Sequence, residues 1–268
     1  MRGSSEVMKR AIASTQFGPA QFSPAPSRVS LSPRKPVSSV GFFAAVGPGF
    51  FHTGGATPSV RLHLRSDLHL ARKAWHMFMG CVIAFIYWSG MSVSTSVTIL
   101  GSVLVWDLAM ETARLKIPAF NEVLMRAWGP FMRDCERNRL SGIPHYLSAT
   151  LLAIAIFPKP VALLSILFLA CGDPIASLFG ILYGKKSIQF ASGKSLIGTA
   201  AGVVACALVS FFFLGTIPLS SGSFWVLTAV GALAGGMAEL VPLDVDDNFS
   251  IPVISGFVLW LTFIVLGI

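Results

Sequence analysis

Charged side chains are scarce in this sequence of 268 residues. Lys, Arg, Asp and Glu together make up 12% of the chain, whereas the hydrophobic class makes up 54%. A soluble globular domain carries about 25% charged residues, so an ordinary soluble fold is excluded. A chain this apolar is not disordered throughout either, since disorder requires low hydrophobicity. The composition therefore predicts an all-α, polytopic membrane protein.

Cysteine is also scarce. The sequence holds four cysteines, and no two of them have the C-x-x-C spacing. A disulfide-stapled scaffold needs a much higher cysteine content, and structural zinc sites usually carry paired cysteines. A disulfide-stapled scaffold is therefore excluded, and a structural zinc site is disfavoured.

The net charge of +8 is unevenly distributed. Residues 1–65 contain eight basic residues and one acid, so twelve basic and eleven acidic residues, of 20 and 12 in total, remain for 66–268. A nucleic-acid-binding surface is therefore not expected on residues 66–268. We predict a disordered basic N-terminal extension over 1–65, followed by a transmembrane domain over 66–268. Three interpretations of the extension stay open: a disordered tail, residues upstream of the true start, or an organelle transit peptide. A transit peptide has the same Ser-rich, acid-poor composition.

Apolar segments long enough to cross a bilayer, which takes about 20 residues, recur from residue 74 onward. We predict seven transmembrane helices, over 74–90, 92–110, 143–158, 161–180, 196–217, 223–242 and 251–267. Basic residues at helical spacing with apolar ones predict an amphipathic helix on the membrane surface over 118–139. Positive charge alternates between the connecting loops, which places the N-terminus on the cytoplasmic side, or on the stromal side in a plastid, and the C-terminus on the far side.

Acidic residues are rare, and most of those in the transmembrane domain lie near the cytoplasmic ends of the predicted helices. A single acid there is readily explained as a structural ion pair, but seven on one face predict a functional site. Clustered carboxylates suit Mg²⁺ that is also bound to phosphates. The seven acids are Asp107, Glu111, Asp173, Glu239, Asp244, Asp246 and Asp247.

A proline follows an aspartate inside the fourth predicted helix, at Gly172-Asp173-Pro174. Because proline disrupts a helix interior and Asp-Pro is typical of a helix start, this pattern predicts a broken helix that restarts at Pro174. The new N-terminus would attract phosphate.

A glycine-rich basic segment comes next. It lacks the glycine that a Walker A loop requires, since Ile188 stands at that position. Backbone N–H groups and lysines of such a segment nevertheless suit a polyphosphate. The residues in question are Gly180, Gly184, Lys185, Gly193, Lys194, Ser195 and Gly198.

Together with an Arg72-Lys73-x-x-His76 segment, these patterns resemble the CTP-dependent lipid kinases, the family of dolichol, phytol, farnesol and CTP-dependent diacylglycerol kinases. The resemblance covers about residues 70–268. Its further segments are Asp107-x-x-x-Glu111, Glu136 with Ser141-Gly142, Gly172-Asp173-Pro174-x-Ala176-Ser177-x-x-Gly180, Gly184-Lys185, Gly193-Lys194-Ser195-x-x-Gly198, Glu239 and Asp246-Asp247-Asn248-x-x-Ile251-Pro252. The chain departs from the family pattern at Ile197, where many relatives have Glu, and at Thr199, where Ser is expected.

The resemblance implies that residues 66–268 form a catalytic domain that transfers the γ-phosphoryl group of CTP to a lipid hydroxyl with Mg²⁺. It implies catalytic roles for Asp173, Lys73 and His76, with Asp173 as the carboxylate that would orient the acceptor. It assigns the nucleotide phosphates to Gly172, Gly180, Gly184, Lys185, Gly193, Lys194, Ser195 and Gly198. It assigns Mg²⁺ to Asp107, Glu111, Asp173, Glu239, Asp246 and Asp247.

The expected partners are CTP, a lipid alcohol and membrane lipids, and no nucleic acid. The acceptor stays open between a polyprenol, phytol and diacylglycerol, because apolar residues do not encode the choice. The first alternative is a phosphatidate cytidylyltransferase, which also uses CTP and Mg²⁺, although its usual Lys-Asp and His-Gly-Gly segments are not found. The second is an ion-coupled transporter with Asp173 at a broken helix.

Overall fold

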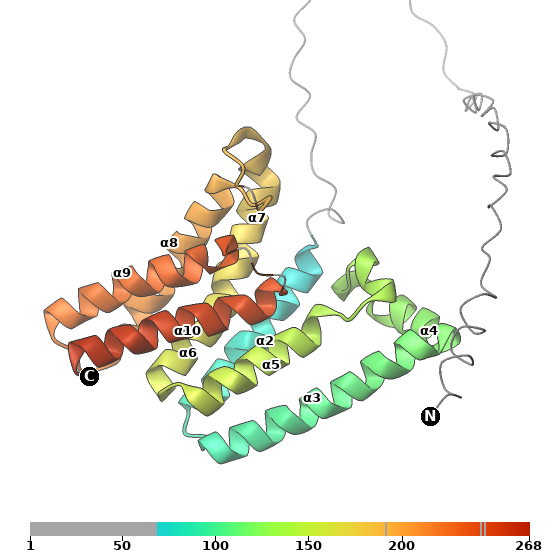
Figure 1. Ribbon diagram of the computed structural model, residues 1–268, viewed down its shortest axis with the longest axis horizontal. Coiled ribbons are helices and arrows are strands. Elements are labelled where there is room, and N and C mark those ends of the chain that lie inside the picture. The colour runs from blue at the N-terminus through green and yellow to red at the C-terminus, as the bar shows by residue number, and fades with distance from the viewer. Residues whose placement is uncertain (1–68, 191, 242, 244) are drawn as a thin grey trace, which may run out of the picture. The chain divides into compact units, whose positions relative to one another are not determined.

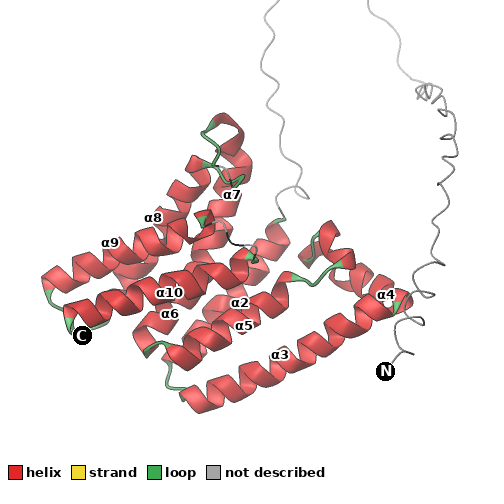
Figure 2. Ribbon diagram, viewed as in Figure 1, coloured by secondary structure: helices red, strands yellow, loops and turns green. Residues whose placement is uncertain are grey.

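The computed structural model of the protein describes residues 69–190, 192–241, 243 and 245–268. All of them belong to the unit Ser59–Ile268. They form helices joined by short turns, and this part of the chain contains no strand, which confirms the all-α prediction (Figure 2). The predicted extension 1–65 and Asp244 lie outside the described residues.

The helices follow one another closely along the chain (Figure 1). They are α2 (Leu70–Trp88), α3 (Val93–Lys116), α4 (Pro118–Trp128), η1 (Gly129–Phe131), η2 (Asp134–Asn138), α5 (Gly142–Ile156), α6 (Lys159–Leu167), η3 (Phe168–Gly172), α7 (Asp173–Tyr183), η4 (Gly184–Lys186), α8 (Leu196–Leu214), α9 (Ser221–Met237), η5 (Ala238–Leu240) and α10 (Asp247–Leu266).

Five helical stretches of the described chain are long and apolar enough to span a membrane. They are Val93–Lys116, Lys159–Lys186, Leu196–Leu214, Ser221–Leu240 and Asp247–Leu266. The predicted count of seven is not confirmed. Helix α5 has 15 residues, and at about 1.5 Å per residue it is shorter than a bilayer core of about 30 Å. Helix α2 carries Arg72, Lys73 and His76 in its first two turns, which lowers its apolar character.

The predicted break before Pro174 is not confirmed either. The chain stays helical from α6 through η3 into α7, and η3 is a π-helical turn in which the N–H of Asp173 donates to the carbonyl of Phe168. A π turn is wider than an α turn and shifts the carbonyls that a proline ring would otherwise meet. Pro174, which has no N–H, is thereby accommodated without unwinding the backbone.

The centre of the helical bundle is formed by α6 and η3. Val161, Leu164, Phe168 and Leu169 are fully buried. Helix α10 packs against α9, α5 and α6, and α8 packs between α7 and α9. Helix α3 lies at the edge, where it contacts α5 and α4 (Figure 1). The π turn that precedes Asp173 is therefore held at the middle of the bundle by apolar contacts.

The segment between α3 and α5 lies at the surface. Helix α4 covers the first part of the predicted amphipathic helix and has no buried residue. It continues through two short helical turns, η1 and η2, rather than as one helix to residue 139. Two aromatic residues of this segment, Trp128 and Phe131, contact Trp75 of α2.

Candidate active site

A polar cavity of about 200 Å³ lies where the start of α2 faces the start of α7. Its residues come from α2, from the turn between η1 and η2, from α7 and from α10. They are His69, Arg72, Lys73, His76, Arg133, Asp173, Ser177, Ile181 and Asn248. The three residues predicted to be catalytic, Asp173, Lys73 and His76, thus line one pocket, although Asp173 is about a hundred residues from the other two in sequence.

The pocket concentrates positive charge around one carboxylate. Burial lowers the pKa of Lys73 below its ordinary value; the charge of Asp173 opposes this shift, and the charges of Arg72 and Arg133 add to it. Burial also lowers the pKa of Arg72, and the neighbouring Arg133 lowers it further. Like charges held together in a partly buried site attract an anion. The pocket is therefore suited to a ligand with several negative charges.

His76 lies deeper on α2. Its ring packs edge-on against Tyr146, with the ring centroids 4.6 Å apart. Its Nε2 atom is buried and has no hydrogen-bond partner among the described residues. The ring is thus fixed by packing while one nitrogen remains available to a bound group.

Lys194 joins two carboxylates beside this pocket. Its Nζ atom lies 2.6 Å from Oδ2 of Asp247 and 3.2 Å from Oε2 of Glu239. The hydroxyl of Thr199 donates to the other oxygen of Glu239, at 3.0 Å. Burial lowers the pKa of Lys194, but the hydrogen bond to Asp247 and the charges of Asp247, Glu239 and Asp173 outweigh it, so that the pKa is raised. The ammonium group therefore takes the position of the cation between these acids.

A short turn presents Lys194 to the acids. The N–H of Phe190 donates to the carbonyl of Lys194 at 2.8 Å, and the N–H of Gly193 donates back to Phe190 at 2.9 Å. Gly193 has a φ of 78°, a conformation that favours glycine. Ser195 then caps α8, since its Oγ accepts from the N–H of Gly198 at 3.1 Å. Of the predicted phosphate-binding lysines, Lys194 reaches the acidic cluster, whereas Lys185 lies exposed on η4.

The other glycines of the predicted phosphate-binding set have a packing role. A Cβ atom on Gly184 would lie 2.6 Å from Oγ of Ser195, and one on Gly198 would lie 2.9 Å from the carbonyl oxygen of Ala176 and 3.1 Å from Cα of Gly180. A Cβ on Gly172 would lie 2.6 Å from Sγ of Cys206. These glycines let α7 and α8 approach closely, as small residues do between membrane helices.

The donor set for a metal is limited. No group of three or more His, Cys, Asp or Glu side chains in the described part of the chain is arranged to hold a metal ion. Asp246 caps α10 by accepting from the N–H of Asn248 at 3.0 Å, and its other oxygen lies 3.9 Å from Nη1 of Arg133. Mg²⁺ is often held by only one or two carboxylates together with substrate phosphates. Asp247 and Glu239 are carboxylates of the kind used in that mode, but the ammonium group of Lys194 lies between them, so their role as Mg²⁺ ligands stays a prediction.

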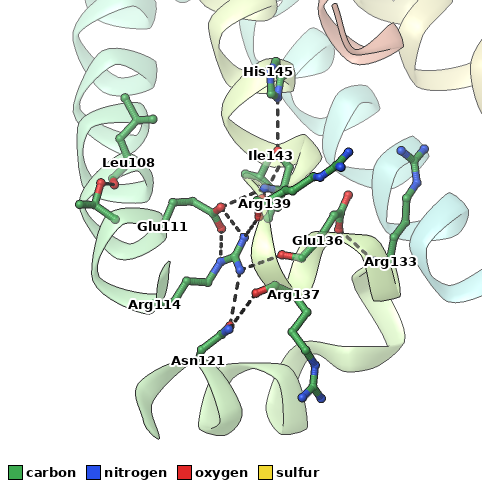
Figure 3. A network of polar contacts seen from close by, with 12 residues as sticks. Leu108, Glu111, Arg114, Asn121, Arg133, Glu136, Arg137, Arg139, Ile143 and His145 are labelled. Atoms are coloured by element: carbon green, nitrogen blue, oxygen red, sulfur yellow. Dashed lines mark hydrogen bonds and ion pairs between the residues drawn. The ribbon is translucent and has the colours of Figure 1, made fainter. Parts of the chain in front are cut away.

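Asp107 and Glu111 belong to a second cluster. Both oxygens of Glu111 accept from Arg114, at 2.8 and 2.6 Å, and one also accepts from the N–H of Ser141 at 2.9 Å. Asp107 interacts electrostatically with Glu111 and Arg114, whereas Asp173 interacts with Lys194 and Asp247. The single acidic site expected from the sequence is thus divided into two clusters, because Arg114 engages Glu111 (Figure 3).

Six residues of the pocket lining are absent from the predicted catalytic, phosphate-binding and metal-binding sets: His69, Arg72, Arg133, Ser177, Ile181 and Asn248. Arg72, Ser177 and Asn248 belong to the family-like segments, whereas Arg133 lies in the segment that was predicted as an amphipathic surface helix. The amide of Asn248 donates to the carbonyl of Gly142 at 3.3 Å, which joins α10 to α5. A signal for Arg133 was present in the sequence, because Glu136, three residues later, belongs to the family-like segments.

The curated proteins to which this chain is similar are named as lipid kinases. The CTP-dependent diacylglycerol kinase 1 of Schizosaccharomyces pombe is 28% identical over 201 residues, which cover 72% of this chain and 92% of the relative. The phytol kinase of Synechocystis sp. is 27% identical over 221 residues, 81% of this chain and 90% of the relative. These relatives support the predicted resemblance to the CTP-dependent lipid kinases. A relative from Triticum aestivum, named "Probable phytol kinase, chloroplastic", is 27% identical over 206 residues, 72% of this chain and 67% of the relative.

The names of these relatives, which are all kinases, support the prediction that this chain is a kinase. No protein-family model matches the chain, and no solved structure shows a significant match.

Proposed function

We propose that the protein transfers the γ-phosphoryl group of CTP to the hydroxyl group of a membrane lipid alcohol. The observation that carries this proposal is the pocket around Asp173, in which Arg72, Lys73 and Arg133 surround one carboxylate. Phosphoryl transfer depends on positioning and on the neutralisation of phosphate charge. The pocket supplies both with residues from four separate segments.

The residues take the following roles. Arg72 and Lys73 bind phosphate oxygens at the start of α2, and Lys194 does so from the turn before α8. Asp173 accepts a hydrogen bond from the acceptor hydroxyl and orients it, with His76 beside it. Asp247 and Glu239 would hold Mg²⁺, with Asp246 as a further predicted ligand, and a bound ion would supply charge neutralisation for the phosphates.

The acceptor enters from the membrane. Helix α2 carries the pocket residues in its first turns and exposes Phe78 and Phe85 further along, with 59 and 64% of their surface accessible. An apolar chain can lie against this face while its hydroxyl reaches the pocket. Diacylglycerol, phytol and polyprenols all fit that description, and the named relatives include kinases for the first two.

The pocket lies at the cytoplasmic ends of the helices in the predicted topology, where CTP is present. The N-terminus is on that side and the C-terminus on the far side. If the basic extension is a transit peptide, the membrane is a plastid membrane, the compartment that the name of the Triticum aestivum relative states.

Labelled CTP tests the reaction against its nearest rival. The full-length protein in lipid vesicles is given CTP labelled at the α or the γ phosphorus, with diacylglycerol, phytol or a polyprenol in the bilayer. We expect label from the γ position alone in the lipid product. Label from the α position would identify a cytidylyltransferase and contradict the proposal. Ion flux into the same vesicles without CTP would instead favour the transporter.

A further inference from the structure

Arg133 lines the active-site pocket although its segment lies on the surface. It stands between η1 and η2, and half of its side-chain surface is exposed. Its nearest acidic partner is Asp246, at 3.9 Å from Nη1 to Oδ2. An ion pair this long and this exposed contributes little energy. The guanidinium group can therefore exchange Asp246 for a stronger acceptor that enters the pocket.

The backbone of Arg133 is held in place by Glu136. One oxygen of this buried carboxylate accepts from the N–H of Arg133 at 2.9 Å, and the other accepts from Nη1 of Arg72 at 3.2 Å. A single side chain thus sets the positions of both arginines that flank Asp173. Charge-assisted hydrogen bonds of this kind are stronger than neutral ones.

Glu136 is itself held by the second acidic cluster. Arg114, with 2% of its side chain exposed, donates to the carbonyl of Glu136 at 2.9 Å and to that of Arg139 at 2.6 Å. Glu111 fixes the guanidinium from the other side (Figure 3). The cluster therefore ties the segment that contains Arg133 to the end of α3.

Aromatic contacts hold the same segment against α2. The ring of Trp75 lies 5.7 Å from that of Phe131 and 6.3 Å from that of Trp128, measured between centroids. Trp75 lies two residues after Lys73 of the pocket. Arg133 is thus placed between an aromatic contact on one side and an ionic network on the other. Its backbone is fixed while its side chain remains able to move.

We propose that Arg133 is a phosphate-binding residue of this kinase, and that Glu136 and the Glu111–Arg114 pair are its positioning residues. The proposal rests on the proposed function. It adds Arg133 to Arg72 and Lys73 as a third cationic side chain that binds phosphate in the pocket. A planar guanidinium offers two parallel N–H donors to a phosphate, which a lysine cannot do. The predicted metal ligand Glu111 then acts on catalysis through Arg114 and the backbone, without touching a metal.

The chain provides a matched control. Arg137 lies on the same segment, its side chain is likewise half exposed, and it pairs with Glu122 on the surface rather than with the pocket. We compare Arg133→Gln, Arg133→Lys and Arg137→Gln in the full-length protein in lipid vesicles. The readouts are kcat and KM for CTP, and the equilibrium affinity for inorganic tripolyphosphate.

We expect Arg133→Gln to weaken tripolyphosphate binding about ten-fold or more, as for a lost charged hydrogen bond, and to lower kcat/KM for CTP at least as much. Arg133→Lys keeps the charge and should recover part of the loss. Arg137→Gln should change both quantities less than about two-fold. Equal losses in the two Gln variants would show a general effect of surface charge and overturn the proposal.

The two proposals can fail separately. If wild-type protein transfers the γ-phosphoryl group and Arg133→Gln matches it in both readouts, the proposal for Arg133 is wrong and the kinase function stands. If wild-type protein transfers no phosphoryl group but binds tripolyphosphate in an Arg133-dependent way, the pocket is a polyphosphate site and the proposed function is wrong.

Glu136→Ala and Glu136→Gln together test the positioning role. Both variants lose the charge that pairs with Arg72, but only the Gln side chain can still accept from the N–H of Arg133. We expect Glu136→Ala to lose more tripolyphosphate affinity than Glu136→Gln, and this difference to shrink when Arg133 is already Gln, since the remaining contact acts through Arg133. A difference that stays the same in the Arg133→Gln background would show that Glu136 does not act through Arg133.

Discussion

The two acidic clusters of this protein use similar residues in different ways. In the Glu111–Arg114 pair, 6 and 2% of the side-chain surface is exposed, and the carboxylate is satisfied by three protein donors. In the Lys194–Asp247 pair, 31 and 38% is exposed. A buried pair that is fully satisfied holds the fold, because breaking it leaves a buried charge. A half-exposed pair can open to admit a ligand at little cost in stability.

Removing Arg114 should have the largest effect on stability. Arg114→Ala leaves Glu111 buried without its partner, and we expect a loss of about 3–5 kcal/mol in the free energy of unfolding. Denaturant unfolding of the detergent-solubilised protein measures it, with Arg137→Ala as an exposed control that should lose less than about 0.5 kcal/mol. A small loss in Arg114→Ala would show that this cluster is not structural.

Asp173→Asn should have the largest effect on catalysis. If the carboxylate orients the acceptor hydroxyl and accepts its proton, we expect γ-phosphoryl transfer to fall about 100-fold or more. The protein should insert into the membrane and unfold like the wild type. Turnover within a few-fold of wild type would refute the assignment of Asp173 as a catalytic residue. A loss of folding would show that Asp173 stabilises the fold instead.

Asp247→Asn should separate function from stability in the half-exposed cluster. We expect phosphoryl transfer to be lost while the free energy of unfolding changes by less than about 1 kcal/mol, since the pair is partly solvated. A titration of activity with Mg²⁺ in both proteins measures whether the loss is one of metal affinity. A variant as active as the wild type would remove Asp247 from the Mg²⁺ site.

The smallest effect expected is the pH dependence of the Lys194 ion pairs. The pKa of Lys194 is raised above its ordinary value of 10.5. Because the folded protein holds this proton more tightly than the unfolded chain, the pairs stabilise fully below the ordinary pKa and lose their effect as pH rises through the raised one. The difference in unfolding free energy between wild type and Lys194→Ala should therefore be constant around neutral pH. A fall of this difference between pH 7 and 9 would contradict the raised pKa.

Apolar runs were enough to predict an all-α membrane protein, because composition and local pattern are displayed directly by a sequence. The kinase activity and the catalytic roles of Lys73, His76 and Asp173 were instead implied by the family resemblance, and the structure places these three residues around one pocket. The π turn before Asp173 was not predictable, because a proline alone does not distinguish a break from a widened turn. The packing role of Gly184 and Gly198 also became visible only with α7 and α8 side by side.

The division of the acids into two clusters was likewise decided by tertiary structure. Glu111 and Asp247 look alike in sequence, since both are acids beside an apolar helix. Their surroundings differ because Glu111 is bonded by Arg114 of its own helix, whereas Asp247 is bonded by Lys194, which lies 53 positions earlier in the chain. The sequence by itself determined which charged residues lie next to the apolar helices. Only the folded chain determined which of them are satisfied by protein and which are left partly exposed to bind a ligand, because that depends on the partners that packing brings within hydrogen-bond distance.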